Sequence, residues 1–273
     1  MWRRFRAPRR NQIGPAAAAG PKPLPAGETV ADYYEAFTDV YLRATGDFIQ
    51  AFRTSDTEGL MTYLAASSGL RDGMRILDAG CGVGAPAIWI ARRFPSSKIS
   101  CLTNSRRQFE LASERVAASG LGDRITVLTG DYHELDALYP AASFDRVLFL
   151  ESLGHHQGLT RVIDGAAAVL ASGGAIFIKD FFRRTSRVHA VKAEIDAAIA
   201  TINRNYVYNV MDLSELIDTL RQSNFTLAYA RQPDLVPDLG LTIAFEHEAE
   251  RLTYPSFASV HAVDWMELHA VRN

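Results

Sequence analysis

The sequence of 273 residues predicts an α/β fold built on a doubly wound parallel sheet. Two observations carry this prediction. From residue 75 to residue 179, short apolar runs alternate with segments of helical periodicity, which is typical of strands joined by right-handed crossovers. The first run ends in Asp78, and Gly80, Gly82 and Gly84 follow at alternate positions. A strand, a tight turn and a helix N-terminus in this order form a ligand site at the carboxyl edge of such a sheet.

The residues before the first strand predict a helical cap. Apolar side chains from Val30 to Tyr41 recur at spacings of three and four. Gly46 is expected to interrupt this helix, and residues 48–52 to continue its apolar face. A second helix is expected over residues 57–68. Together these segments would cover the sheet ahead of its first strand.

The core elements then follow in order. Strands are expected at Arg75–Leu77, Ile99–Leu102, Ile125–Leu128, Arg146–Leu150 and Ala175–Ile178. Helices are expected at Ala85–Phe94, Arg106–Ser119, His133–Leu138 and Thr160–Leu170. After residue 179 the pattern changes to helix, helix, strand, helix and closing strand, at Ser186–Arg204, Asp212–Ser223, Phe225–Ala230, Leu241–Leu252 and Asp264–Val271.

Residues 28–273 are therefore expected to form one domain. Its parts are the cap, the ligand-binding core, the lid helices with the sixth strand, and the last strand, over residues 28–70, 71–185, 186–262 and 263–273. Residues 1–27 hold six basic residues, no acid and no periodic apolar face, so we expect a disordered tail. An organelle presequence is the alternative. The tail lacks the apolar segment of an export signal.

Composition excludes several classes of function. Without the six basic residues of the tail, 23 basic residues face 31 acids, so the body carries about −8, which argues against nucleic acid as a partner. No apolar run approaches the ~20 residues of a membrane span. Cys81 and Cys101 fall in predicted core positions, as free thiols do in a reducing compartment such as the cytoplasm. We expect a small-molecule substrate, and the sequence leaves a homo-oligomer open.

The acid beside the glycine turn indicates which ligand the turn binds. Gly80-x-Gly82-x-x-Ala85 also fits a dinucleotide fingerprint, and an ordinary strand-to-helix turn is the plainer alternative. A carboxylate at Asp78 would repel a pyrophosphate, but it suits a ligand that carries an ammonium and a sulfonium. S-adenosylmethionine carries both. We therefore expect Asp78, Gly80, Cys81 and Gly82 to bind this cofactor.

The ends of the second and third strands predict contacts to the ribose and the base. Thr103 and Asn104 end the second strand, and Gln108 follows; an amide can hydrogen-bond a diol. The alternative for Ser105-x-x-Gln108 is a helix capping box, which is compatible with ribose binding.

Asp131 and Tyr132 end the third strand. Asp131 could accept from the adenine amino group while Tyr132 covers the ring. The alternative for Asp131 is a helix N-cap.

The fourth strand ends in a carboxylate. Glu151 leaves an apolar strand at the carboxyl edge, where a charge is costly unless it is solvated or used. His155 and His156 follow within one turn. Either histidine is a candidate base, a partner for Glu151 or an ordinary surface residue; His155 is favoured for function.

These motifs together resemble the class I S-adenosylmethionine-dependent methyltransferases over roughly residues 70–180. The glycine turn, Gly130-Asp131 and the Phe144-Asp145-x-Val147 strand carry the resemblance. It implies a Rossmann-like sheet of seven strands with the last one antiparallel, and N-terminal and inserted helical caps.

Finer features are similar to C-methyltransferases of cyclopropane fatty acids, sterol side chains and prenyl diphosphates. They are Thr103-x-Ser105-x-x-Gln108 and Glu151-Ser152-x-x-His155, and the segment 202–210 resembles the lid of geranyl diphosphate C-methyltransferases. This resemblance implies substrate contacts by Tyr33, Tyr34, Phe181, Asn203, Tyr206, Tyr208 and Asn209. The segment 235–262 matches weakly.

The resemblance implies C-methylation of an alkene in a prenyl diphosphate or terpenoid, through a carbocation that aromatic rings stabilise. The candidate rings are Phe149, Phe181, Tyr206, Tyr208 and Trp265. Glu151 would remove the proton. A diphosphate would need Mg²⁺, held with Asn203 and Asn209, or arginines, for which Arg43, Arg53, Arg183, Arg184 and Arg204 are candidates. The alternatives are an O- or N-methyltransferase with His155 as base, and a cofactor-binding protein without activity.

Overall fold

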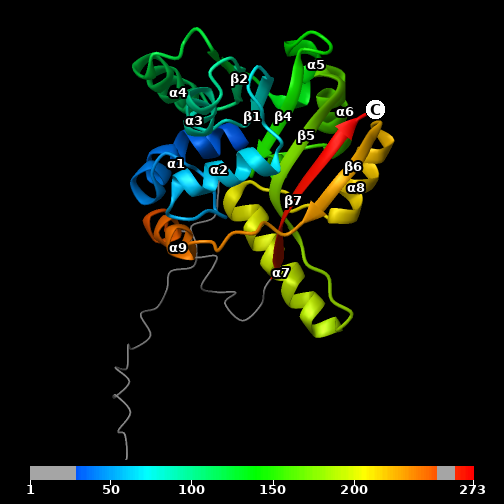
Figure 1. Ribbon diagram of the computed structural model, residues 1–273. Coiled ribbons are helices and arrows are strands. Elements are labelled where there is room, and N and C mark those ends of the chain that lie inside the picture. Colours follow the sequence, from blue (N-terminus) through cyan, green and yellow to red (C-terminus); the bar gives the residue numbers. More distant parts are fainter. Residues whose placement is uncertain (1–28, 251–261) are drawn as a thin grey trace, which may run out of the picture.

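The computed structural model describes residues 29–250 and 262–273, so the predicted tail lies outside the described residues. Seven strands form one sheet in the order β3-β2-β1-β4-β5-β7-β6 (Figure 1). Strands β1 to β5 pair in parallel, and β7 is antiparallel to both of its neighbours. The predicted Rossmann-like sheet with an antiparallel last strand is confirmed.

The strands have the following bounds: β1 Arg75–Ala79, β2 Lys98–Thr103, β3 Ile125–Thr129, β4 Phe144–Leu150, β5 Leu170–Arg183, β6 Phe225–Arg231 and β7 Val263–Arg272. The α-helices in the described part are α1 Val30–Thr45, α2 Thr57–Ser67, α3 Ala85–Arg93, α4 Arg106–Ser119, α5 Leu135–Leu138, α6 Leu159–Val169, α7 His189–Tyr206, α8 Leu213–Gln222 and α9 Leu239–Glu248. Short 3₁₀ turns occupy Tyr132–Glu134 and Leu153–His155.

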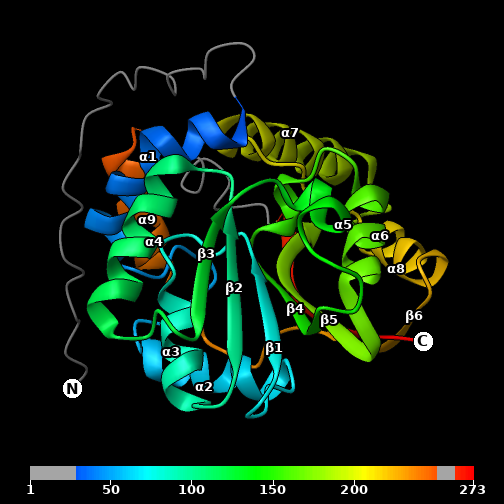
Figure 2. The ribbon, with the colours of Figure 1, turned by 90° about the horizontal axis from the view of Figure 1, so that it is seen from above.

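The sheet is buried on both faces because its central strands are apolar at successive positions. On one face Leu77, Val147 and Ile176 pack with α6 and α8. On the other face Ile76 and Phe177 pack with α2 and α3. Helices α1, α7 and α9 lie together at one end of the sheet, where α1 and α7 run across the top of Figure 2.

Strand order reverses between β1 and β4, which are neighbours in the sheet although β2 and β3 separate them in sequence. In an open parallel sheet, the crevice at such a point is where ligands bind. Residues of α1, α7 and α9 line the cavity described below. These three helices therefore cover the carboxyl ends of the strands at this point. Among the described residues, no helix is both long and apolar enough to cross a membrane.

The expectation for residues 48–52 is wrong. Helix α1 ends at Thr45, where Gly46 adopts a φ of 73°, and residues 46–56 are irregular apart from a turn and two bends. The backbone N–H groups of Ala51 and Phe52 donate to the Glu151 side chain instead of to helical carbonyls. We call residues 46–53 the bridging loop.

Candidate active site

A cleft at the carboxyl ends of β1 to β4 collects every residue that the sequence predicts for the cofactor. The nine residues are Asp78, Gly80, Cys81, Gly82, Thr103, Asn104, Gln108, Asp131 and Tyr132. They come from the ends of three strands, β1, β2 and β3, that are far apart in sequence. Residues of α1 and the bridging loop, including Tyr34 and Gln50, close the cleft from the other side.

Asp78 fits a cationic ligand group. Its side chain is 1% exposed, and within the described residues Oδ2 has no hydrogen-bond partner. Burial raises the pKa of this carboxyl to about 7. A buried carboxylate oxygen without a donor is costly, and an ammonium in the cleft would remove that cost. The chain's own residues therefore fit S-adenosylmethionine.

The glycines of the turn differ in their roles. A Cβ on Gly82 (φ 53°) would meet only Ile49 Cδ1, at 3.9 Å, so this residue faces open space beside the cleft. A Cβ on Gly80 would lie 2.4 Å from the Cβ of Ser152. Gly80 is therefore required by packing against the end of β4, whereas Gly82 leaves room for a ligand.

The end of β2 is held by side-chain contacts. Thr103 Oγ1 donates to Gln108 Oε1 at 2.8 Å, and Ser105 Oγ accepts from the Gln108 N–H at 3.2 Å. The serine half of the predicted capping box is therefore present, while the glutamine side chain bonds Thr103. This contact holds Gln108 against the cleft.

Asp131 is an N-cap, as the alternative expectation had it. Its Oδ1 accepts from the His133 N–H at 2.9 Å and contacts the His133 ring. The hydrogen bond from the His133 side chain is the main cause that lowers the pKa of Asp131. Tyr132 lies beside it and donates from its hydroxyl to the Ser152 carbonyl at 3.0 Å. Both residues still line the cleft.

A second cavity, of about 510 Å³, adjoins the cleft and is mainly apolar and aromatic. Its rings come from α1, β5, α7, the residues after α7, α9 and β7: Tyr33, Tyr34, Tyr41, Phe181, Tyr206, Tyr208, Phe245 and Trp265. Five of the seven predicted substrate residues are among them. Phe149 does not line the cavity: it is fully buried in the core under the sheet.

Asn203 and Asn209 do not line this cavity. Asn203 Oδ1 accepts from the Val210 N–H at 2.9 Å, and the Asn209 N–H donates to the Gly154 carbonyl at 2.6 Å. Both residues hold the chain reversal after α7, where Val207 adopts a φ of 50°. Asn209 also approaches His156, with 3.4 Å between Nδ2 and Nε2.

Within the described residues, no lysine or arginine side chain lines the cavity, but the carboxylates Glu151 and Glu246 do. The candidate arginines are engaged or exposed. Arg43 pairs with Glu248 at 3.0 Å, Arg184 with Asp264 at 3.1 Å and Arg183 with Asp196, while Arg53 donates to the Phe48 carbonyl and Arg204 is exposed. No group of three or more His, Cys, Asp or Glu side chains in the described part is arranged to hold a metal ion.

Five residues line both the cleft and the cavity: Tyr34, Ile49, Gln50, Glu151 and His155. We call them the junction. They mark the place where a group held in the cleft meets a molecule held in the cavity. Both predicted catalytic residues are in this set.

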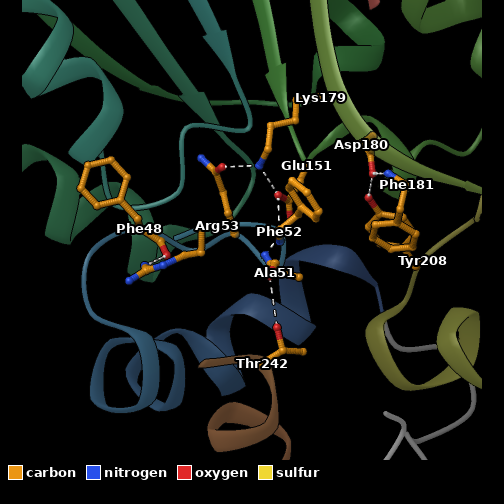
Figure 3. A network of polar contacts seen from close by, with 11 residues as sticks. Phe48, Ala51, Phe52, Arg53, Glu151, Lys179, Asp180, Phe181, Tyr208 and Thr242 are labelled. Atoms are coloured by element: carbon orange, nitrogen blue, oxygen red, sulfur yellow. Dashed lines mark hydrogen bonds and ion pairs between the residues drawn. The ribbon is translucent and has the colours of Figure 1, made fainter. Parts of the chain in front are cut away.

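Glu151 is held at the junction by several donors (Figure 3). It adopts a φ of 61°, which is strained for a residue with a side chain. Its carboxylate pairs with the buried Lys179 ammonium and accepts from the N–H groups of Ala51, at 2.5 Å, and Phe52, at 3.2 Å.

His155 has a defined tautomer. Its Nδ1 lies 3.0 Å from the Val207 carbonyl, which can only accept, so Nδ1 carries the hydrogen. Its Nε2 then accepts from the Tyr34 hydroxyl at 2.9 Å. Burial lowers the pKa of His155 to about 4, so the imidazole is neutral. His156 is also buried, and its pKa is lowered, but it lines neither the cleft nor the cavity.

Sequence reasoning missed Lys179 and Asp180. Both are fully buried, and burial raises the pKa of Asp180 to about 7. Asp180 accepts from the Tyr208 hydroxyl and from the Gly154 N–H, so it fixes a ring of the cavity (Figure 3). Two charged residues directly after an apolar strand were the available signal.

Sequence comparison supports the geometry. A family described as a methyltransferase domain matches residues 76–174. A sterol 24-C-methyltransferase of Gibberella zeae is 28% identical over 216 residues, which cover 75% of this chain and 56% of the relative. The 27-O-demethylrifamycin SV methyltransferase of Amycolatopsis mediterranei is 35% identical over 168 residues, 59% of this chain and 60% of the relative. The chain spans about half the length of the sterol relatives it matches.

Solved structures share the fold. The cyclase SpnF superposes with a TM-score of 0.71 at 20% identity, over 90% of this chain and 97% of that one. The geranyl diphosphate C-methyltransferase of Streptomyces coelicolor superposes with a TM-score of 0.66 at 15% identity, over 79% and 76%. Residues 76–174 therefore match a methyltransferase domain, and the sheet and the glycine-turn cleft have the class I S-adenosylmethionine-dependent methyltransferase fold, with similarity to the sterol and prenyl types.

Proposed function

We propose that the chain methylates an alkene carbon of an apolar, terpenoid-sized molecule. The observation that carries this proposal is the junction: the cofactor cleft and an aromatic cavity of about 510 Å³ meet at Glu151 and His155. Cavities of this size hold drug-sized ligands. The sterol 24-C-methyltransferases among the relatives support carbon as the acceptor.

S-adenosylmethionine, when bound, supplies an electrophilic methyl group on a sulfonium. In the cleft, Asp78 is suited to its ammonium, and Asn104 and Gln108 to its ribose. The cavity residues hold the acceptor in line and exclude water, which matters because an alkene is a poor nucleophile and gains most of its rate from positioning.

Methyl transfer to an alkene leaves a carbocation in the cavity. The rings of Phe181, Tyr208 and Trp265 pack on one another there, with centroids 4.6 Å and 4.9 Å apart. Their faces and the nearby carboxylate of Glu151 would stabilise a positive charge. The same surroundings disfavour an anion.

An uncharged terpenoid suits this cavity better than a prenyl diphosphate. A diphosphate needs cations, and no described lysine or arginine lines the cavity, whereas two carboxylates do. We therefore place the substrate head group beside neutral hydroxyl groups such as Tyr208 and Thr242, whose oxygens can accept from a substrate hydroxyl because their own hydrogens are donated to Asp180 and to the Ala51 carbonyl. On this proposal Mg²⁺ is not required.

Glu151 is the group that we assign to proton removal. A C–H next to a carbocation is so acidic that a carboxylate already holding Lys179 and two amides can accept its proton. A neutral hydroxyl group is far less acidic, and a carboxylate held by these donors is too weak a base to deprotonate it. The contacts of Glu151 are therefore better suited to carbon methylation than to oxygen methylation.

A second candidate function is O- or N-methylation, and the Tyr34–His155 hydrogen bond favours it. The neutral imidazole has its Nε2 at the junction, and Tyr34 could pass a proton from a substrate hydroxyl to it. The rifamycin methyltransferase among the relatives supports this alternative.

Incubation with methyl-labelled S-adenosylmethionine tests the proposal. Geraniol and farnesol should be offered beside geranyl and farnesyl diphosphates, each with Mg²⁺ or EDTA, and products analysed by mass spectrometry and NMR. We expect a new C–CH₃ in an uncharged substrate, unaffected by EDTA. A methoxy product would favour the second function, and turnover of a diphosphate only with Mg²⁺ would contradict the substrate class.

A further inference from the structure

The bridging loop separates the two pockets. Ile49 and Gln50 line both the cleft and the cavity, and Asp47 lines the cleft alone. Because the loop has no regular secondary structure, its position depends on side-chain contacts from other segments. Arg115 pairs with Asp47 at one end of the loop, and the Asp238 N–H donates to the Arg53 carbonyl at the other. Between them, Thr242 of α9 donates to the Ala51 carbonyl at 3.1 Å, and residues 50–52 also form hydrogen bonds with Glu151 and Lys179 (Figure 3).

Lys179 holds Glu151 from two sides. The Glu151 N–H donates to the Lys179 carbonyl at 2.7 Å, and the Lys179 ammonium donates to Glu151 Oε1. The same ammonium donates to Gln50 Oε1 at 2.7 Å and lies 5.7 Å from the centroid of the Phe52 ring. One buried ammonium thus contacts the end of β4 and the bridging loop together.

The pair is suited to fastening the loop in one position. The Lys179 side chain is 0% exposed and that of Glu151 is 5% exposed. A buried ion that loses its partner is strongly unfavourable, so the contacts form and break together. Burial also shields the pair from salt, unlike the exposed Lys192–Asp196 pair on α7.

We propose that Lys179 is a positioning residue that acts through Glu151. It holds Glu151, whose backbone is in the left-handed region, in one position. The Glu151 carboxylate then fastens the bridging loop between the cofactor and the acceptor. The cofactor enters and leaves when this fastening opens. The effect on turnover rests on the function proposed above, but the fastening of the loop does not.

Amide hydrogen exchange in the full-length protein tests the fastening without any substrate. We expect slow exchange at the N–H groups of Ala51 and Phe52. Lys179→Met should speed exchange at these two amides about tenfold or more, and should leave amides of β1 and β4 unchanged. Lys192→Met is the matched control, because it removes an exposed ammonium, and should change neither set.

The double variant Lys179→Met with Glu151→Gln distinguishes loss of the loop contacts from a general loss of stability. A glutamine side-chain oxygen still accepts from the two amides and leaves no unpaired buried charge. We expect the double variant to exchange within about threefold of the wild type at both amides, so the two changes are not additive. Additive effects, or unchanged exchange in a folded Lys179→Met protein, would overturn the proposal.

Cofactor dissociation gives a second readout. Stopped-flow displacement of S-adenosylmethionine should be about tenfold faster in Lys179→Met, and restored in the double variant. If Lys179→Met does not fold, the double variant and Gln50→Leu carry the test, and normal dissociation in Gln50→Leu together with normal amide exchange would contradict it. Loss of methyl transfer to every terpenoid, with these two readouts as expected, would refute the proposed function alone.

Discussion

The cofactor cleft and the aromatic cavity are built in different ways. Four successive strand ends between residues 78 and 152 supply most of the cleft, and the sheet fixes their spacing. Side chains from residue 33 to residue 265 supply the cavity, mainly from helices and loops that pack beyond the sheet. The sheet therefore fixes the shape of the cleft, whereas the shape of the cavity depends on how the covering helices and loops pack against the sheet. Substitutions in the two regions should separate cofactor binding from substrate binding.

The largest effect should come from Gly82→Val. A Cβ at a φ of 53° strains the turn, and a branched side chain would fill the space beside the cleft. We expect S-adenosylmethionine affinity to fall by about 10²-fold or more in calorimetry. Gly73→Val is the matched control, because Gly73 also has a positive φ, of 82°, but nothing lies within 4 Å of its added Cβ. Equal losses of affinity in the two variants would make strain alone the cause.

The junction belongs to both regions, and Glu151→Gln tests which chemistry it performs. This change keeps the shape and removes the basicity, and it is made together with Lys179→Met so that no unpaired ammonium stays buried; binding of cofactor and acceptor should then survive. Turnover should fall by about 10²-fold, the usual scale for a positioned base.

His155→Ala is the paired variant, measured by kcat and product distribution. On the C-methylation proposal its effect is smaller than that of Glu151→Gln. If His155→Ala is the crippling change and Glu151→Gln is mild, the O- or N-methylation alternative holds instead.

Helix α4 shows why much of the fold can be predicted from the sequence. It runs over Arg106–Ser119, as expected, because Ser105 caps its start and Gly120 adopts a φ of 70° at its end. Both signals are local. The cleft residues follow for the same reason, since most of them lie at or just after the end of an apolar strand.

The bridging loop and β5 show what the sequence does not reveal. The amides of residues 51 and 52 bond a carboxylate about a hundred residues away, so local periodicity wrongly continued the helix. Strand β5 was expected to stop at Ile178 but runs to Arg183, because β7 pairs along it and buried partners accommodate Lys179 and Asp180. Charged residues after an apolar run predict the end of a strand, and only their distant partners show that the strand continues.

Cofactor affinity should depend on pH through Asp78. Its carboxyl has a pKa of about 7 in the folded protein against an ordinary value of 3.8, so folding favours the protonated form. The contribution of Asp78 to the stability of the cofactor-free protein is therefore largest below about pH 4 and is lost as pH rises through 7. An ammonium binds the ionised form, so affinity should rise as pH passes through 7.

From pH 6 to pH 8 the ionised fraction, and with it the affinity, should rise about tenfold. Calorimetry across this range on Asp78→Asn should give weaker binding and a flat profile. Asp180 shares the same pKa and contributes to the stability profile, so affinity is the cleaner measurement. A wild-type slope that persists in Asp78→Asn would assign the titration to another group.

The smallest effect should come from Asn209→Ala, although the sequence resemblance assigns this residue to the substrate. Its backbone N–H holds the Gly154 carbonyl, a contact that alanine keeps, and its side chain makes only a long contact to His156. Because the side chain lies outside the cavity, KM for an uncharged terpenoid should change by less than about threefold. The matched change inside the cavity is Tyr208→Phe, which removes the hydroxyl that donates to Asp180 and should raise KM several-fold more. If Asn209→Ala instead raises KM strongly for a diphosphate substrate, and only when Mg²⁺ is present, the head group reaches the chain reversal after α7. The division between a cleft fixed by the sheet and a cavity formed by the covering segments would then need a third, polar subsite.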